Sequence, residues 1–311
     1  MPIRLGIVDF DSSHSVEFTR RINHLEIAED QWVDGAQVVV ACPGTSLLSP
    51  ERVPGFTREM KQLGVPLVDN PRDMIGQIDG VLILSVDGSV HAERTRPFLE
   101  AGIPCFVDKP FTCNRAEAEL LVRHARQYSA PIFSSSALRY APEVVAFFSR
   151  TTDADSDTGA ILGATVYGPA PTRNRNPGLF HYGIHAIEVL FTLLGPDCEW
   201  LTSVRQGGDA ETEESGAEMV TGHWSGGRIG SMYGIRSGKR TYGFVAFCER
   251  AVRHVTIESE HYPFYRDLLR EVIRFFETGS APVPVAETLG ILAFIEAARV
   301  SSEAGGSPVR I

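Results

Sequence analysis

The sequence has few cysteines, no excess of positive charge and no long apolar run, and each shortage excludes a class of protein. Its five cysteines are an odd number without C-x-x-C spacing, which favours free thiols in a reducing cytoplasm over a disulfide framework. A net charge of -10 without a basic stripe argues against a nucleic-acid partner. No apolar run could span a bilayer and the N-terminus enters a strand directly, so we expect neither a membrane partner nor a signal peptide.

The overall composition is that of a soluble globular protein. Hydrophobic residues make up 43% of the sequence and charged residues 22%. A length of 311 residues leaves room for two ordinary domains with sizeable cores.

The first part of the sequence alternates short apolar runs with amphipathic stretches. The expected strands are residues 5–8, 37–41, 66–68, 80–84, 105–107 and 131–134, and the expected helices are 15–25, 58–63, 90–101 and 115–128. This alternation predicts an α/β fold whose N-terminal domain, residues 1–139, is a Rossmann-like, doubly wound parallel sheet.

The second part has a different pattern. The expected strands are residues 161–167, 201–205, 217–224, 228–235, 242–247 and 252–257, and the expected helices are 185–194, 262–277 and 285–303. Links such as Ser225-Gly226-Gly227 have the composition of hairpin turns. Residues 140–311 are therefore predicted to form an α+β domain for substrate binding and oligomerisation, with a mostly antiparallel open sheet.

The glycine fingerprint of a dinucleotide site is missing after the first strand. A G-x-G-x-x-G motif is expected there, but Asp9, Asp11 and His14 occupy its glycine positions. The two carboxylates would repel a pyrophosphate unless they point away from it. Ser12 or Ser13 could cap the following helix and leave its amides and positive dipole end available to an anion.

The acid that usually binds the cofactor ribose after the second strand is missing as well. The strand runs into Cys42-Pro43-Gly44-Thr45-Ser46, which contains no acid. Thr45 and Ser46 could bind a ribose or a 2′-phosphate, but small polar residues are common in loops. The sequence therefore does not distinguish NAD from NADP as a cofactor.

Four segments nevertheless resemble one family in sequence order. Residues 101–111 (A-G-I-P-C-F-V-D-K-P-F) resemble the "AGKHVLCEKP" signature of the Gfo/Idh/MocA family of oxidoreductases. Residues 85–91 resemble its "TPN…H" turn, residues 181–188 its "D-x-G-x-H-x-x-D" helix and residues 296–305 its "EAAxxSAxxG" ending. The loop D-S-S-H, residues 11–14, is similar to the "D-T-S-H" loop of a divergent set of dehydrogenase-like members.

The resemblance implies an NAD(P)-dependent oxidoreductase that transfers a hydride to or from a sugar, a cyclitol or a related polyol. Lys109 matches the family's catalytic lysine, with Asp108 in place of glutamate, and His185 matches its acid–base histidine. His181 stands where many members have an aspartate, which puts the usual proton relay in doubt. The alternatives are a surface lysine at a strand end and a buried, hydrogen-bonded histidine.

Further candidates follow from the same motifs. The candidate catalytic residues are Lys109, His185 and His181; the cofactor-side candidates are Asp9, Asp11, Ser12, Ser13, His14, Ser85, Asp87, His91 and Lys109; the substrate-side candidates are Arg139, Asn176 and His181. His91 could instead cap its helix, and Arg139 could form a salt bridge at a domain interface. His181, His185 and Glu188 could share a helix face, and the spacing of the two histidines can bind zinc, but without an identified third ligand we expect no metal.

Three functions remain open from the sequence. The first is a dehydrogenase or reductase of a polyhydroxylated small molecule. The second is a non-redox enzyme on the same scaffold, such as a lyase, an epimerase or a hydrolase, with lost or altered cofactor binding. The third is a catalytically silent binding or regulatory protein. The resemblance also implies a homodimer or a homotetramer formed through the C-terminal sheet.

Overall fold

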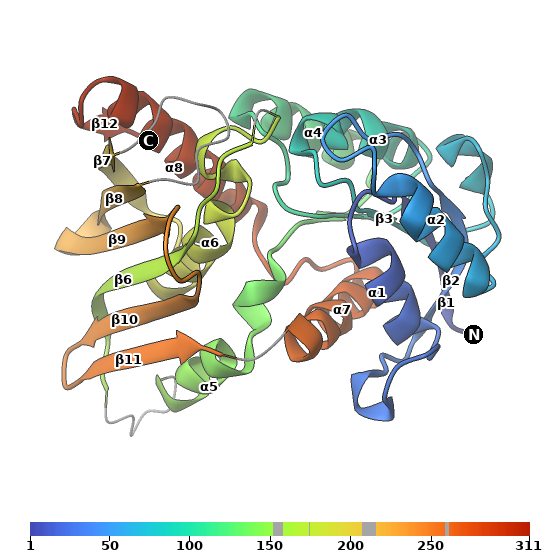
Figure 1. Ribbon diagram of the computed structural model, residues 1–311, viewed down its shortest axis with the longest axis horizontal. Coiled ribbons are helices and arrows are strands. Elements are labelled where there is room, and N and C mark those ends of the chain that lie inside the picture. Colours follow the sequence, from blue (N-terminus) through green and yellow to red (C-terminus); the bar gives the residue numbers. More distant parts are fainter. Residues whose placement is uncertain (152–157, 174, 207–215, 259–260) are drawn as a thin grey trace. The chain divides into compact units, whose positions relative to one another are not determined.

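Each of the two units of this protein contains one β-sheet. The structure is a computed structural model that describes residues 1–311 except 152–157, 174, 207–215 and 259–260. The first unit comprises Met1–Ser135 and His261–Val285, and the second comprises Ser136–Glu260 and Ala286–Ile311 (Figure 1).

The first unit contains a five-stranded, wholly parallel sheet in the order β2-β1-β3-β4-β5. Its strands are β1 (Ile3–Val8), β2 (Ala36–Cys42), β3 (Gly80–Ile83), β4 (Cys105–Val107) and β5 (Ile132–Phe133). The strands read as apolar runs because helices cover both faces of a parallel sheet, and Ile7 and Leu82 are fully buried.

The helices of this unit form neighbouring pairs. They are α1 (His14–Ile22), α2 (Val53–Gln62), α3 (His91–Glu100), α4 (Arg115–Gln127) and α7 (His261–Thr278). Helix α1 lies beside α2 and α7, and α3 lies beside α4 (Figure 1).

The strand order defines where this sheet can bind a ligand. The chain runs outward from β1 to β2 and then returns to β3 on the other side of β1, so the order reverses between β1 and β3. A single parallel bridge between Ala41 and Leu67 extends the sheet beyond β2, where the sequence predicts a short strand. Ligands of open α/β sheets bind at the carboxyl ends of the strands beside such a reversal.

The second unit contains a seven-stranded sheet in the order β11-β10-β6-β9-β8-β7-β12. Its strands are β6 (Ile161–Pro169), β7 (Cys198–Gln206), β8 (Ala217–Trp224), β9 (Arg228–Ile235), β10 (Tyr242–Cys248), β11 (Val252–Ile257) and β12 (Val309–Arg310). All pairs are antiparallel except β6 with β9. The predicted fold class is therefore confirmed in both units.

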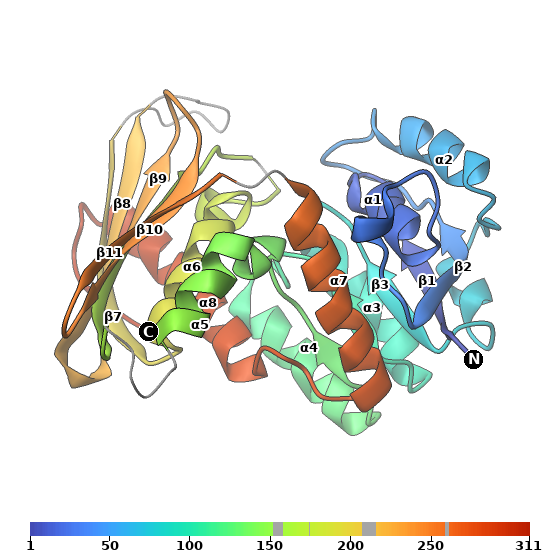
Figure 2. The ribbon, with the colours of Figure 1, turned by 90° about the horizontal axis from the view of Figure 1, so that it is seen from below.

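Helices of the second unit lie on one face of its sheet (Figure 2). They are α5 (Pro142–Thr151), α6 (Gly183–Leu194) and α8 (Val285–Glu303). Phe147 of α5 meets the ring of Phe244, while Phe191 of α6 and Phe294 of α8 both meet Trp224. The sequence analysis does not predict α5.

The first unit is built from two separate segments of the chain. The first unit's N-terminal segment ends at Ser135, and α7 joins that unit from a distant part of the sequence. Phe275 on α7 is fully buried, and its ring lies 5.6 Å from that of Phe133 in β5. The apolar face of α7 therefore belongs to the first core, which spacing along the sequence does not reveal.

No helix within the described residues is both long enough and apolar enough to cross a membrane.

Candidate active site

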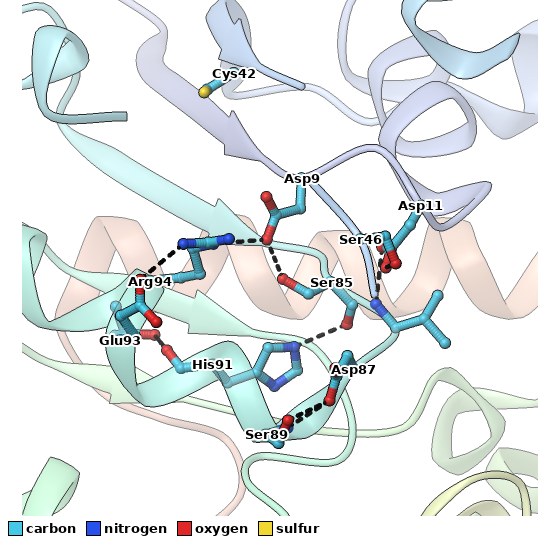
Figure 3. A network of polar contacts seen from close by, with 12 residues as sticks. Asp9, Asp11, Cys42, Ser46, Ser85, Asp87, Ser89, His91, Glu93 and Arg94 are labelled. Carbon is cyan, nitrogen blue, oxygen red and sulfur yellow. Dashed lines mark hydrogen bonds and ion pairs between the residues drawn. The ribbon is translucent and has the colours of Figure 1, made fainter. Parts of the chain in front are cut away.

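The carboxylate of Asp9 lies at the end of β1 and reaches toward β3 and α3. Its Oδ2 accepts hydrogen bonds from the hydroxyl of Ser85 and from Nε of Arg94, the latter at 3.2 Å (Figure 3). Burial raises the pKa of Asp9, although Ser85 and Arg94 oppose that rise. Asp9 has a left-handed backbone with a φ of 70°, at the position where the fingerprint has its first glycine. The turn is thus made without a glycine.

The other oxygen of Asp9 lies against Gly44 in the loop after β2. This Oδ1 atom is buried and has no hydrogen-bond partner in the described part of the chain. A Cβ on Gly44 would lie 1.7 Å from Oδ1, and Gly44 itself has a φ of 62°. The glycine that this pair of loops requires therefore follows β2 instead of β1.

Asp11 connects three strand ends through one carboxylate. Its Oδ2 accepts the hydroxyl hydrogen of Ser46 at 2.7 Å, and its Oδ1 accepts the backbone N–H of Val86 at 2.9 Å. Asp11 is only 2% exposed, so both bonds are shielded from water. Figure 3 shows Asp9 turned toward Arg94 and Asp11 turned toward Ser46. Each acid therefore faces a protein donor.

Ser12 and Ser13 prepare the start of α1. The hydroxyl oxygen of Ser12 accepts the backbone N–H of His14 at 3.2 Å. Ser13 is the N-cap residue, but its side chain makes no capping hydrogen bond. Of the two predicted caps, only Ser12 holds an amide of the first turn.

His14 joins this loop to the end of β4. Its Nδ1 lies 2.6 Å from Oδ2 of Asp108, and Oδ1 of Asp108 accepts the backbone N–H of Lys109 at 2.8 Å. Burial by itself would raise the pKa of Asp108, but His14 and Lys109 together hold it below its ordinary value. Lys109 is half-buried and precedes Pro110 through a cis peptide bond. The predicted catalytic lysine therefore lies just after the carboxyl end of β4, the strand next to β3.

His91 and Asp87 hold the loop after β3. His91 is buried, with Nδ1 lying 2.7 Å from the carbonyl of Pro110 and Nε2 lying 2.8 Å from the carbonyl of Ser85. Asp87 accepts hydrogen bonds from the backbone N–H and the hydroxyl of Ser89. His91 thus cross-links two loops, a role that the sequence analysis does not propose for it.

In the second unit, His185 occupies the first turn of α6. Its Nδ1 lies 2.6 Å from the hydroxyl oxygen of Ser136, which also accepts the N–H of Leu138 at 3.1 Å. Glu188, almost one turn later, accepts the backbone N–H of Ser136 at 2.8 Å. One face of α6 therefore holds both the candidate acid–base residue and the carboxylate that fixes its hydrogen-bond partner.

Arg139 forms a buried ion-pair cluster behind this histidine. Its Nε lies 3.3 Å from Glu188, and its terminal nitrogen lies 2.6 Å from Glu287 at the start of α8. Burial by itself would lower the pKa of Arg139, but the two carboxylates raise it. Burial also raises the pKa of Glu188 against the opposing effect of Arg139. Arg139 therefore forms salt bridges with two residues of its own unit.

His181 and Asn176 lie near one another, before α6. Nδ1 of His181 lies 3.5 Å from the side-chain nitrogen of Asn176, and both residues are buried. Because α6 begins at Gly183, His181 lies outside the helix and does not share a helical face with His185 and Glu188. Among the described residues, no cluster of three metal-ligating side chains is present.

In the loop after β1, the backbone offers more to a dinucleotide than the side chains do. Asp9 makes the left-handed turn, and α1 begins directly after the loop, so its positive dipole end faces the strand ends. Arg94 pairs with Asp9, and Asp11 is bound by Ser46 and Val86. Both acids are therefore turned toward their own partners, which is the condition for leaving room for an anion.

The comparison with protein families covers part of this site, including Lys109 but not the loop of residues 9–14. Residues 23–135 match the family GFO_IDH_MocA, described as an oxidoreductase family with an NAD-binding Rossmann fold. The first unit therefore has the Rossmann-type fold that describes this oxidoreductase family. The match confirms the resemblance to the Gfo/Idh/MocA family over residues 23–135.

Solved structures share the fold of the whole chain. GenD2 from gentamicin A biosynthesis, in complex with NAD, has a TM-score of 0.82 and 13% identity over 100% of this chain and 96% of that chain. Myo-inositol 2-dehydrogenase from Lactobacillus plantarum has a TM-score of 0.80 and 18% identity over 100% of both chains. UDP-N-acetylglucosamine 3-dehydrogenase GnnA from Acidithiobacillus ferrooxidans has a TM-score of 0.77 and 13% identity over 98% of both. A comparison with the curated proteins finds no match.

Sequence reasoning missed four residues that shape these sites: Gly44, Arg94, Ser136 and Glu287. Arg94 lies one turn after His91 on α3, and this spacing is the one signal that could have drawn attention to it. Glu287 is separated from Arg139 by 148 residues, so no local pattern connects them.

Proposed function

We propose that this protein is an NAD(P)-dependent dehydrogenase that acts on a CH–OH group of a polyhydroxylated small molecule, such as a sugar or a cyclitol. The observation that carries the proposal is the position of Lys109 at the carboxyl end of β4, within the segment that matches the oxidoreductase family. Proteins of similar fold that are named as an inositol dehydrogenase and a UDP-sugar dehydrogenase support the substrate class.

The proposed reaction removes a hydride and a proton from the alcohol and leaves a carbonyl. Bound NAD or NADP supplies the hydride acceptor. His185 takes the hydroxyl proton through Nε2, with Nδ1 donating its hydrogen to the hydroxyl oxygen of Ser136. The ammonium of Lys109 stabilises the negative charge that develops on the substrate oxygen. His181 and Asn176 are proposed to contact the other hydroxyl groups of the substrate.

Calorimetry with NAD, NADH, NADP and NADPH tests the cofactor part of this proposal. We expect at least one of these nucleotides to bind, and turnover should then be measured with a panel of inositols, hexoses and nucleotide sugars. Lys109→Ala is expected to lower kcat by roughly a hundredfold or more. Lys61→Ala, on the exposed face of α2, is the matched control and should not change kcat.

One observation favours a second candidate, a non-redox enzyme on the same scaffold. Asp9 and Asp11 place two buried carboxylates at positions where the fingerprint has glycines. Absence of binding by all four nucleotides, together with loss of a lyase, epimerase or hydrolase activity in Lys109→Ala, would select this candidate. Unchanged biological activity in Lys109→Ala would instead select a silent binding protein.

The outward face of the second sheet supports self-association, which belongs to the same proposal. The side chains in register across β9, β8 and β7 include Ile229, His223 and Trp200 in one row and Tyr233 and Met219 in another. The part of this face that these rows cover is uncharged and partly exposed. We expect a homodimer or a homotetramer by light scattering, and Ile229→Lys should shift it toward the monomer.

A cytoplasmic location is also part of this proposal. It is supported by the five cysteines, which are all free and fit a reducing compartment.

A further inference from the structure

Two departures from the family pattern meet in a single contact. His14 stands where a dinucleotide loop has its third glycine, and Asp108 stands where the family signature has a glutamate. The two side chains lie 2.6 Å apart, although they are 94 residues apart in the sequence. The two positions that depart from the family pattern are therefore in direct contact in this protein.

The surroundings of this pair fix the imidazole in one orientation. The ring of His14 stacks on Phe18 with centroids 4.6 Å apart and meets the ring of Tyr265 edge-on at 4.9 Å. Because an ionised carboxylate can only accept hydrogen bonds, Nδ1 of His14 must carry the hydrogen that lies between it and Asp108. The side chain of Asp108 is 4% exposed, so this contact is shielded from solvent.

Asp108 transmits this contact to Lys109. One of its oxygens binds His14, and the other accepts the backbone N–H of Lys109 at 2.8 Å. The backbone N–H of Asp108 also donates to the carbonyl of Ile83, which extends the pairing of β4 with β3. A carboxylate that is held at both oxygens fixes the chain at the point where the lysine side chain begins.

We propose that His14 is a positioning residue for Lys109 and acts through the carboxylate of Asp108. The catalytic consequence rests on the proposed function, because it needs Lys109 to act on the substrate. The contact itself does not depend on it. In this protein an imidazole–carboxylate pair therefore replaces the glycine–glutamate combination of the family and connects the loop after β1 to the lysine loop.

The contact can be tested in the protein without cofactor. Long-range ¹H–¹⁵N spectra above neutral pH should show His14 with its hydrogen on Nδ1, the signal being assigned by its loss in His14→Gln. Asp108→Ala should replace this single form with a mixture of tautomers. His124→Gln, which removes a histidine that lies 3.7 Å from Glu100 on the surface, should leave the His14 signal unchanged. A hydrogen on Nε2 of His14 with none on Nδ1 in the unaltered protein would overturn the proposal.

The positioning role predicts that a substitution at His14 and one at Asp108 compensate for each other. His14→Ala and Asp108→Glu should each lower kcat by about tenfold or more, because a small misplacement of a catalytic group is costly. Their effect on the Kd for the cofactor should stay within about threefold. The double variant restores the family combination, because alanine is accepted at the third fingerprint position, and should recover most of kcat.

The results separate the two proposals. Additive losses in the double variant, or a loss of cofactor affinity with kcat unchanged, would show that His14 does not position Lys109. Failure of the proposed function would appear differently, as full activity in Lys109→Ala or as absence of nucleotide binding. In that case the tautomer of His14 and its dependence on Asp108 would still be observed.

Discussion

The Oδ1 atom of Asp9 lies where a side chain on Gly44 would begin. A Cβ at Gly44 would be 1.7 Å from this oxygen, while the Oδ2 atom of the same carboxylate is held by Ser85 and Arg94. The loop after β1 and the loop after β2 are therefore fitted to each other at this one contact.

Replacement of Gly44 by alanine should destabilise the fold. The left-handed backbone alone costs about 1–2 kcal/mol. Displacement of Asp9 from its partners should add about 1–3 kcal/mol. Gly64→Ala is the matched control, because Gly64 has a φ of 75° and nothing lies within 4 Å of its Cβ position. Urea unfolding should show a larger loss for Gly44→Ala, and equal losses would contradict the contact.

Asp9 and Asp108 should change stability with pH in opposite directions. Burial raises the pKa of Asp9 above its ordinary 3.8, so its ionised form destabilises the fold and stability is regained as the pH falls toward 3.8. The pKa of Asp108 lies below 3.8, so its stabilisation is present above that value and is lost as the pH falls further.

The measurement for these two groups is the free energy of unfolding as a function of pH. Asp9→Asn should remove the gain on acidification above pH 3.8, and Asp108→Asn should remove the loss below it. The same pH dependence in both variants would contradict the assigned directions.

Asp11→Asn should tighten binding of the nicotinamide nucleotide. The amide can keep both contacts, accepting from Val86 and donating to Ser46, while it removes a negative charge from the loop. Removal of one repulsive charge near a pyrophosphate should improve the Kd by roughly threefold to tenfold. Calorimetry at low ionic strength is the measurement, and a weaker Kd would show that Asp11 itself binds the cofactor.

Ser136→Ala should release the imidazole of His185. Its Nδ1 loses the hydroxyl that lies 2.6 Å away, so the single tautomer should become a mixture in long-range ¹H–¹⁵N spectra. Ser136→Thr retains a hydroxyl and should restore the single form. A single, unchanged tautomer in the alanine variant would show that other contacts orient the ring.

Local sequence patterns predict most of the fold. Alternating apolar runs and amphipathic stretches indicate the parallel sheet, and the hairpin turn at Gly226 and Gly227 indicates the antiparallel one. The position of α7 could not be predicted in this way. Its amphipathic pattern indicates that one face is buried. Only the tertiary contact of Phe275 with Phe133 shows that this face packs into the core of the first unit.

The sequence by itself determined which chemical groups this protein carries: a lysine after a strand, a histidine at the start of a helix, and two carboxylates in place of glycines. A short motif can specify these because it fixes residue types at fixed spacings. Only the tertiary structure decided their partners, since contacts such as His14 with Asp108 and Arg139 with Glu287 join residues far apart in the chain. Electrostatic and hydrogen-bond interactions depend on distance in space, and distance along a sequence does not report it.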